Sequence, residues 1–273
     1  MQSIYPNTES VSVVGGEELS PPEFGTVFIT IKPKNGEFVS DFDKNNILTK
    51  LKSYSLTGIN QKIVDLQVLY VEVDSFIYYN SSQVANVNDL KSKITTSLTS
   101  YATSSDLNRF GGRFKYSKVL NVIDNIDKSI TSNITRVKIR RNLNALINQF
   151  AQYELCFGNR FNVKPEGLNI KSTGFRIQGQ SDTVFITDTP NADKLTGVIS
   201  IVKRDETTGT NIVVVKSAGT VDYVHGEVNL TTINIVSTDK PNNIVEVQAF
   251  PDSNDVIGLQ DLYLEFNLSL IHI

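Results

Sequence analysis

The spacing of hydrophobic residues changes near residue 146, and this change constrains the fold more than any other feature of the sequence. Before it, stretches with helical spacing stand between alternating stretches, whereas after it short alternating stretches are separated by turn residues. Alternation is typical of strands, and a spacing of three or four residues is typical of helices. The length of 273 residues also exceeds the size of about 250 residues that one core usually supports. We therefore expect an N-terminal arm at residues 1–23, a domain at residues 24–145 and a β-rich domain at residues 146–273.

The first domain combines predicted helices with predicted strands. Helical spacing marks residues 41–56, 88–101 and 116–130. Alternation marks residues 27–31, 64–73 and 133–143. Ser40 and Asp43 form a candidate capping pair for the first helix, and Asn88 is the candidate cap of the second. A change of phase between Tyr70 and Val71 indicates a bulge or a sharp bend. The order of elements predicts an α+β fold in which helices pack on a mixed or antiparallel sheet.

The second domain contains two predicted hairpins. Alternating runs flank a loop at residues 205–209, and His225 and Gly226 supply the turn of the second hairpin. The domain ends in an alternating strand, residues 262–273, whose apolar face would be a sticky edge if it were left uncovered. Either the body of the chain or a neighbouring copy must therefore pair with this strand, and we favour cover from its own domain.

Groups suited to catalysis or metal binding are few and scattered. The chain has two histidines, His225 and His272, and one cysteine, Cys156, which cannot supply the closely spaced ligands of a zinc site. Ser217, Asp222 and His225 have the residue types of a hydrolase triad, but one short hairpin cannot readily bring all three onto a common reacting atom. We therefore predict a protein that is not an enzyme and has no cofactor, no metal and no small-molecule substrate.

Charge and hydropathy exclude two further classes of partner. The net charge of −3 is too close to neutral to attract nucleic acid by bulk field. The N-terminus lacks a secretory signal, and nowhere do about 18 apolar residues run together. We expect a soluble chain that is not exported and binds neither nucleic acid nor membrane.

Four surfaces are candidates for contacts with partner proteins. They are the proline pair of the arm, a Gly-Gly loop flanked by basic and aromatic residues, the basic face of a strand, and the apolar face of the final strand. Their residues are Pro21 and Pro22; Phe110, Gly111, Gly112 and Arg113; Arg136, Lys138 and Arg140; and Leu264, Phe266 and Leu268. The Gly-Gly loop could instead cradle a phosphate or serve only as a turn. The basic strand face could be solvated or face an acidic partner.

The order of several segments resembles a known family. The stretch VSVVGGEELSPPEFGTVFITIKP, the helix and bent strands after it, and SYATSSDLNRFGGRFKYSKVLNVIDNIDKSITSNITRVKI together resemble the baseplate J-like proteins of contractile-tailed phages. Among these, the chain is most similar to the baseplate wedge proteins of T-even phages, and this closer resemblance extends through GTVDYVHGEVNL and AFPDSNDV. Members of the family are longer, so we expect this chain to be a C-terminal fragment.

The resemblance implies a structural function. Copies of such a protein pair as homodimers, link wedges into a ring around the tail tube, contact other wedge subunits and rearrange during infection. The expected location is the baseplate of the virion, after assembly in the host cytoplasm. The alternative is a receptor-binding or glycan-binding tail module, although the absence of Trp removes the commonest platform for stacking sugars.

Overall fold

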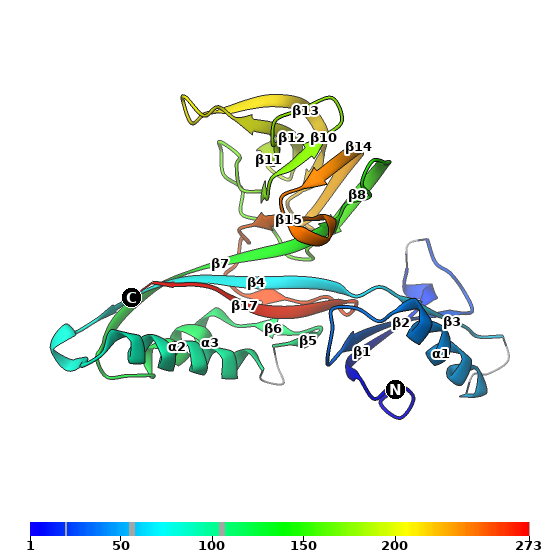
Figure 1. Ribbon diagram of the computed structural model, residues 1–273, viewed down its shortest axis with the longest axis horizontal. Helices are drawn as coiled ribbons and strands as arrows, with labels where there is room; N and C mark the ends of the chain where they lie inside the picture. The colour runs from blue at the N-terminus through cyan, green and yellow to red at the C-terminus, as the bar shows by residue number, and fades with distance from the viewer. Residues whose placement is uncertain (20, 55–57, 104–106, 273) are drawn as a thin grey trace.

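Strands dominate the structure, a computed structural model that describes residues 1–19, 21–54, 58–103 and 107–272 (Figure 1). About 47% of the chain lies in strands and 18% in helices. Among the described residues the strands form three sheets, of 3, 12 and 2 strands. The predicted α+β class was therefore wrong. The protein is mostly β: strands that lie far apart in the sequence join one large mixed sheet, and the helices that lie against the sheets are a minor part of the structure.

The first sheet is small and contains residues from the predicted arm. Its strands are β1 (Thr8–Gly15), β2 (Thr26–Pro33) and β3 (Asn60–Val64). Strand β1 is antiparallel to β2, and β3 is parallel to it. Ile29, Ile31 and Val39 form its core together with Ile47. Whether residues 1–23 act as an arm, and whether the chain divides at residue 145, remain predictions.

Helix α1 (Asp41–Leu51) packs on this sheet and begins as predicted. The Ser40 hydroxyl accepts a hydrogen bond from the backbone N–H of Asp43 at 3.1 Å, which satisfies one of the unpaired donors at the helix start. The helix ends at Leu51, earlier than predicted, and a 3₁₀ turn follows at Lys52–Tyr54. Residues 55–57 of the predicted helix lie outside the described part of the chain.

The long strands of the large sheet run from the left end of the molecule in Figure 1 toward the first sheet on the right. They are β4 (Gln67–Tyr79), β7 (Ile130–Asn144) and β17 (Leu262–His272), with the short β5 (Arg109–Phe110) at the edge. Strand β4 lies between β7, which is antiparallel, and β17, which is parallel. Strand β17 thus pairs within its own chain rather than with a neighbouring copy. Its partners β4 and β5 belong to the first predicted domain, so the cover expected from its own domain was wrong.

The predicted bend lies earlier in the sequence than the change of hydrophobic phase between Tyr70 and Val71 suggested. The break falls at residues 65 and 66, between β3 and β4, and β4 is continuous through Tyr70 and Val71. Leu69, Val71 and Val73 are all buried, so in this part of β4 the odd-numbered residues face the hydrophobic core. Tyr70, on the other face, contains enough apolar surface to imitate the opposite phase.

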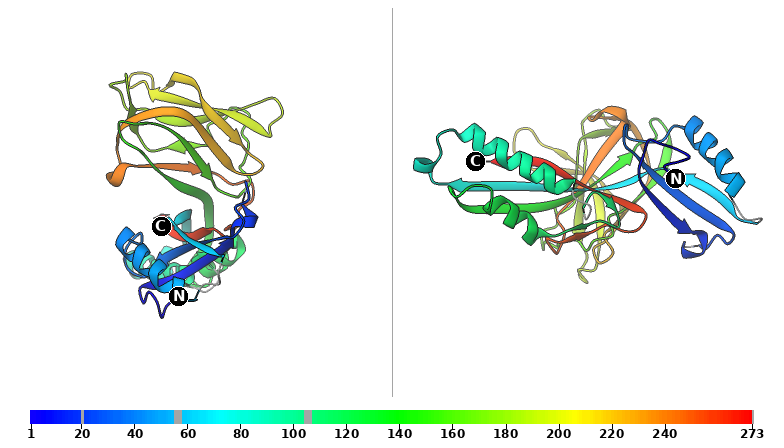
Figure 2. Two further views of the ribbon diagram at one scale, coloured as in Figure 1. Left: turned by 90° about the vertical axis from the view of Figure 1, so that its right-hand side faces the viewer. Right: turned by 90° about the horizontal axis from the view of Figure 1, so that it is seen from below.

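Two helices cover one face of the long strands. Helix α2 (Val87–Ala102) and helix α3 (Tyr116–Asp124) lie below the sheet in Figure 1 and in front of it in the view from below (Figure 2). The N-cap of α2 is Asn86 rather than Asn88: its side chain accepts a hydrogen bond from the Asn88 backbone N–H at 3.0 Å. The two-stranded sheet of β6 (Arg113–Phe114) and β16 (Val256–Ile257) lies beside them.

The remaining strands stand above the long strands (Figure 1). They are β8 (Phe150–Cys156), β9 (Lys171–Ser172), β10 (Phe175–Ile177), β11 (Phe185–Pro190), β12 (Thr196–Arg204), β13 (Asn211–Asp222), β14 (Glu227–Thr238) and β15 (Ile244–Ala249). Further 3₁₀ turns lie at Gly16–Glu18, Ser81–Gln83 and Pro241–Asn243. Both predicted hairpins are confirmed, by the β12–β13 and β13–β14 pairs.

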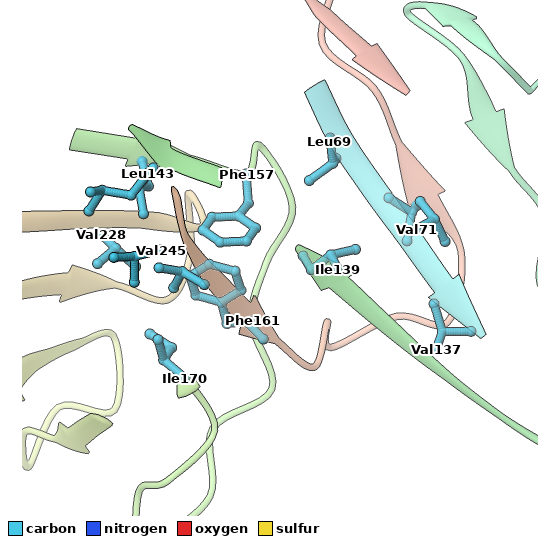
Figure 3. Close-up of a cluster of buried hydrophobic side chains, with 14 of the residues drawn as sticks. Leu69, Val71, Val137, Ile139, Leu143, Phe157, Phe161, Ile170, Val228 and Val245 are labelled. Atoms are coloured by element: carbon cyan, nitrogen blue, oxygen red, sulfur yellow. The ribbon is translucent and has the colours of Figure 1, made fainter. Parts of the chain in front are cut away.

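A continuous hydrophobic core joins the upper strands to the long ones. In Figure 3 the side chains of Leu69 and Val71 on β4 lie beside those of Val137 and Ile139 on β7. The same cluster continues to Phe157, Phe161 and Val228. Strand β7 passes from one group to the other, because it pairs with β4 up to Arg140 and with β15 from Ile139 onward.

Candidate interface surfaces

The long strands have one covered and one open face. Successive residues along a strand point to opposite faces of the sheet. The helices cover the face that carries Leu264 and Phe266. These two side chains are 0% and 6% exposed, and the Phe266 ring lies 5.6 Å from that of Phe114. Leu268 is half-buried on the same face. Contact of these three predicted interface residues with a partner stays a prediction, and Leu264 and Phe266 would first have to be uncovered.

The middle of the opposite face is a network of charged side chains. Arg140 donates from Nε to Glu72 Oε1 at 2.6 Å, and its Nη1 lies 3.2 Å from Glu246 Oε1. Its guanidinium stacks on Tyr70, 4.0 Å from the ring centre. The Arg140 and Glu72 side chains are each 8% exposed. Arg140 therefore serves contacts within the chain.

The other two basic residues of this strand face have different surroundings. Lys138 Nζ lies 3.9 Å from Asp74 Oδ2 and is half-buried. Arg136 is exposed. A partner approaching this face would thus meet Arg136 first.

The far end of the same face is apolar and exposed. Phe76 of β4 is directly opposite Ile134 of β7, and Tyr78 follows on β4. These side chains are 39%, 52% and 53% exposed in that order. The His272 ring stacks on Phe76 at 4.6 Å, and its Nε2 lies 3.4 Å from Asp74 Oδ1. In Figure 1 this end extends beyond the strands that stand above the sheet. We call Phe76, Tyr78, Ile134 and His272 the open sheet face.

Sequence reasoning missed the apolar part of this surface. A signal was present, because Phe76 and Tyr78 alternate in β4 and Ile134 lies two positions before Arg136 on the same strand face. The helices on the other face could not be assigned to one face of these strands from spacing alone, so the exposed side was not identifiable.

The Gly-Gly loop is held by the chain itself. Phe110 pairs with Tyr263, and their rings meet edge to face at 5.4 Å. The N–H of Gly111 donates to the Leu259 carbonyl at 3.1 Å, and that of Gly112 donates to the Arg109 carbonyl at 3.2 Å. Both N–H groups therefore already have acceptors, which argues against a phosphate cradle.

The two glycines have different steric roles. Gly111 has a φ of +61°, with open space where a Cβ would lie. At Gly112 a Cβ would lie 2.2 Å from the Leu107 carbonyl oxygen, so only glycine fits there. Arg113, next along the chain, is exposed, and so are Pro21 and Pro22 near the first sheet. These exposed residues remain predicted contact sites.

The scattered reactive residues lie in unremarkable surroundings. His225 Nδ1 is 2.8 Å from Asp222 Oδ2 on an exposed turn, and this carboxylate raises the pKa of His225. Burial raises the pKa of the Cys156 thiol. Within the described residues, no three His, Cys, Asp or Glu side chains are grouped so that they could hold a metal ion. None of the helices in the described ranges has the length and apolar character needed to cross a membrane.

Comparison with known proteins points to a phage baseplate. Residues 1–64 match the family model of the baseplate structural protein gp6, C-terminal domain I, and residues 67–142 match that of its C-terminal domain III. The baseplate wedge protein gp6 of Enterobacteria phage T4 is 25% identical over 118 residues, which cover 43% of this chain and 18% of that protein. The chain therefore aligns with a small part of that relative. The matches support a place for this chain in the baseplate wedge protein family, with a structural role in the phage baseplate.

Proposed function

We propose that the chain is a self-associating structural subunit of a contractile-tail baseplate wedge. In this proposal it forms homodimers, links wedges into a ring around the tail tube, contacts other wedge subunits and rearranges during infection. Its membership of the wider baseplate J-like family and its assembly in the host cytoplasm are parts of the same proposal. The chain carries out no catalysis in this role.

The open sheet face is the observation that carries self-association. Phe76, Tyr78 and Ile134 are large apolar side chains that lie together on a sheet face, and each is more than a third exposed. Contiguous exposed apolar groups of this kind mark interaction sites on soluble proteins. In a two-fold symmetric contact the same patch would lie on both copies, so each of these residues would be buried in both copies at once.

A stable contact needs more than this patch. Interfaces of stable complexes bury about 1,600 Å² in total, and three side chains supply only part of that area. The neighbouring Arg136 and the exposed turns at the same end would form the polar rim that surrounds the apolar centre of an interface. We expect Tyr78 and Ile134 to contribute most, because they are the most exposed members of the patch.

Sedimentation equilibrium over a wide concentration range tests this proposal. The unmodified chain should form dimers, and Ile134→Thr together with Tyr78→Ser should weaken them. The two substitutions should remove about 1 kcal/mol of dimerisation free energy per copy. Counted on both copies, this loss corresponds to a rise in the dimer Kd of roughly 30-fold. Phe150→Ser is the matched control, because Phe150 is 69% exposed on β8, away from the patch. A chain that remains monomeric at every concentration, or a control as harmful as the double variant, contradicts the proposal.

A further inference from the structure

The large sheet forks where β4 and β7 separate. Pairing of β4 with β7 ends at Tyr70 opposite Arg140, and from there the one described strand that pairs with β7 is β15, on its other side. Residues 141–144 of β7 therefore have an edge with no strand partner among the described residues. Strand β8 is also an edge, because within the described ranges it pairs only with β14.

A groove of about 730 Å³ occupies this fork. One wall is the free edge of β7 at residues 141–144, another is β8 at residues 153–155, and the third comes from β4 and the start of α1. Backbone groups alternate in direction along a strand, so every second residue of the free edge directs its N–H and C=O into the groove. Four residues at about 3.3 Å each give an edge of about 13 Å, enough to pair with a short extended segment.

The charges of the groove favour a basic occupant. Among the described residues, four carboxylates line the groove but only two cations, Lys44 and Arg141. Lys44 is already engaged with Asp41 at 3.1 Å and Asp65 at 2.7 Å. Arg141 is buried and donates to Gln67. The exposed carboxylates of Glu37 and Glu154 are thus left to attract a Lys or Arg from outside.

A further feature fits an added polypeptide strand. Phe38 lines the groove and is 71% exposed, which offers apolar contact to the side chain of an inserted segment. A small ligand would satisfy the charges but not the strand edge.

We propose that this groove binds an extended segment of a partner polypeptide, which pairs with β7 at residues 141–144 and directs a Lys or Arg side chain toward Glu154 and Glu37. Addition of a strand to an exposed sheet edge is an established mode of peptide recognition, in which main-chain hydrogen bonds give affinity and side-chain pockets give specificity. The groove lies apart from the open sheet face, so this inference does not depend on self-association.

A library of random octapeptides, displayed on yeast and selected against the full-length chain, tests the proposal. The selected peptides should contain Lys or Arg with β-branched residues at alternate positions. Glu154→Lys should weaken their binding at least tenfold, and the matched control Glu206→Lys, on the exposed β12–β13 loop, should not. Circular dichroism should show both variants folded.

Amide spectra of the ¹⁵N-labelled chain identify the surface used. A selected peptide should shift the amides of residues 141–144, and N-methylation of its alternate backbone nitrogens should abolish binding. Failure to select any peptide, peptides without a basic residue, equal binding to the Glu154→Lys variant, or shifts confined to other surfaces would each overturn the proposal. Shifts of the same amides on concentrating the chain alone would also overturn it, by showing that a second copy fills the groove.

Discussion

Replacement of Arg140 by Met should destabilise the protein strongly. The change removes the guanidinium that lies 2.6 Å from Glu72 and 3.2 Å from Glu246, and leaves both carboxylates in a largely buried setting. Loss of one member of a buried ion pair typically costs about 3–5 kcal/mol. We expect about 3 kcal/mol, because Gln248 Nε2 still donates to Glu72 Oε2 at 2.9 Å and Met keeps part of the packing on Tyr70.

Urea denaturation followed by far-UV circular dichroism measures this loss as a change in the free energy of unfolding. Arg136→Met is the matched control, since Arg136 is exposed on the same strand face and its replacement should change stability by no more than about 0.5 kcal/mol. Adding Glu72→Gln to Arg140→Met should recover part of the loss, because it removes a buried charge without a partner. The reasoning is refuted if Arg140→Met costs no more than the control, or if the second change adds its own full cost.

Two other perturbations have defined outcomes. Gly111→Ala should lower the free energy of unfolding by about 1 kcal/mol, because alanine disfavours the left-handed backbone at this position. Gly112→Ala should lower it clearly more, because its Cβ would collide with the Leu107 carbonyl oxygen. Equal losses of stability in calorimetry would contradict this. Burial and a 2.7 Å hydrogen bond to Asp188 raise the pKa of Tyr223, so this Tyr contributes stability below its unfolded pKa of about 10 that is lost as pH rises above it. The melting temperature should therefore fall less steeply from pH 8 to 11 in Tyr223→Phe than in the unmodified protein. Parallel plots of melting temperature against pH for the two proteins would contradict this role of Tyr223.

Local structure followed from the sequence where a single short segment determines it. Ser40 with Asp43 specified a helix start, because the hydroxyl and the N–H that it caps lie within one turn. The turn at His225 and Gly226 was identifiable for the same reason, and Gly226 adopts the expected positive φ of +69°. The bend before β4 was misplaced because apolar residues near Tyr70 lie on both strand faces.

The pairing of strands could not be predicted in this way. Alternation specifies which residues share a face, but it does not specify which distant strand lies alongside. The pairing of Leu264 with Leu69 brings together two strands that are far apart in the sequence, and because it is parallel it makes the sheet mixed. The same limit applies to the interface, since Phe76 and Ile134 become neighbours only through this sheet, and Arg140 becomes internal only because Glu246 arrives from β15.

The position of β17 affects how the protein can be made. Leu69 and Val71 of β4 are translated long before residues 262–272, which form the strand that pairs with them. Until then β4 has an unpaired hydrophobic edge, and nascent chains would depend on chaperones or on rapid synthesis to escape aggregation. Deletion of residues 262–272 should for this reason abolish accumulation of the protein, because β4 would then lack the strand that pairs with it.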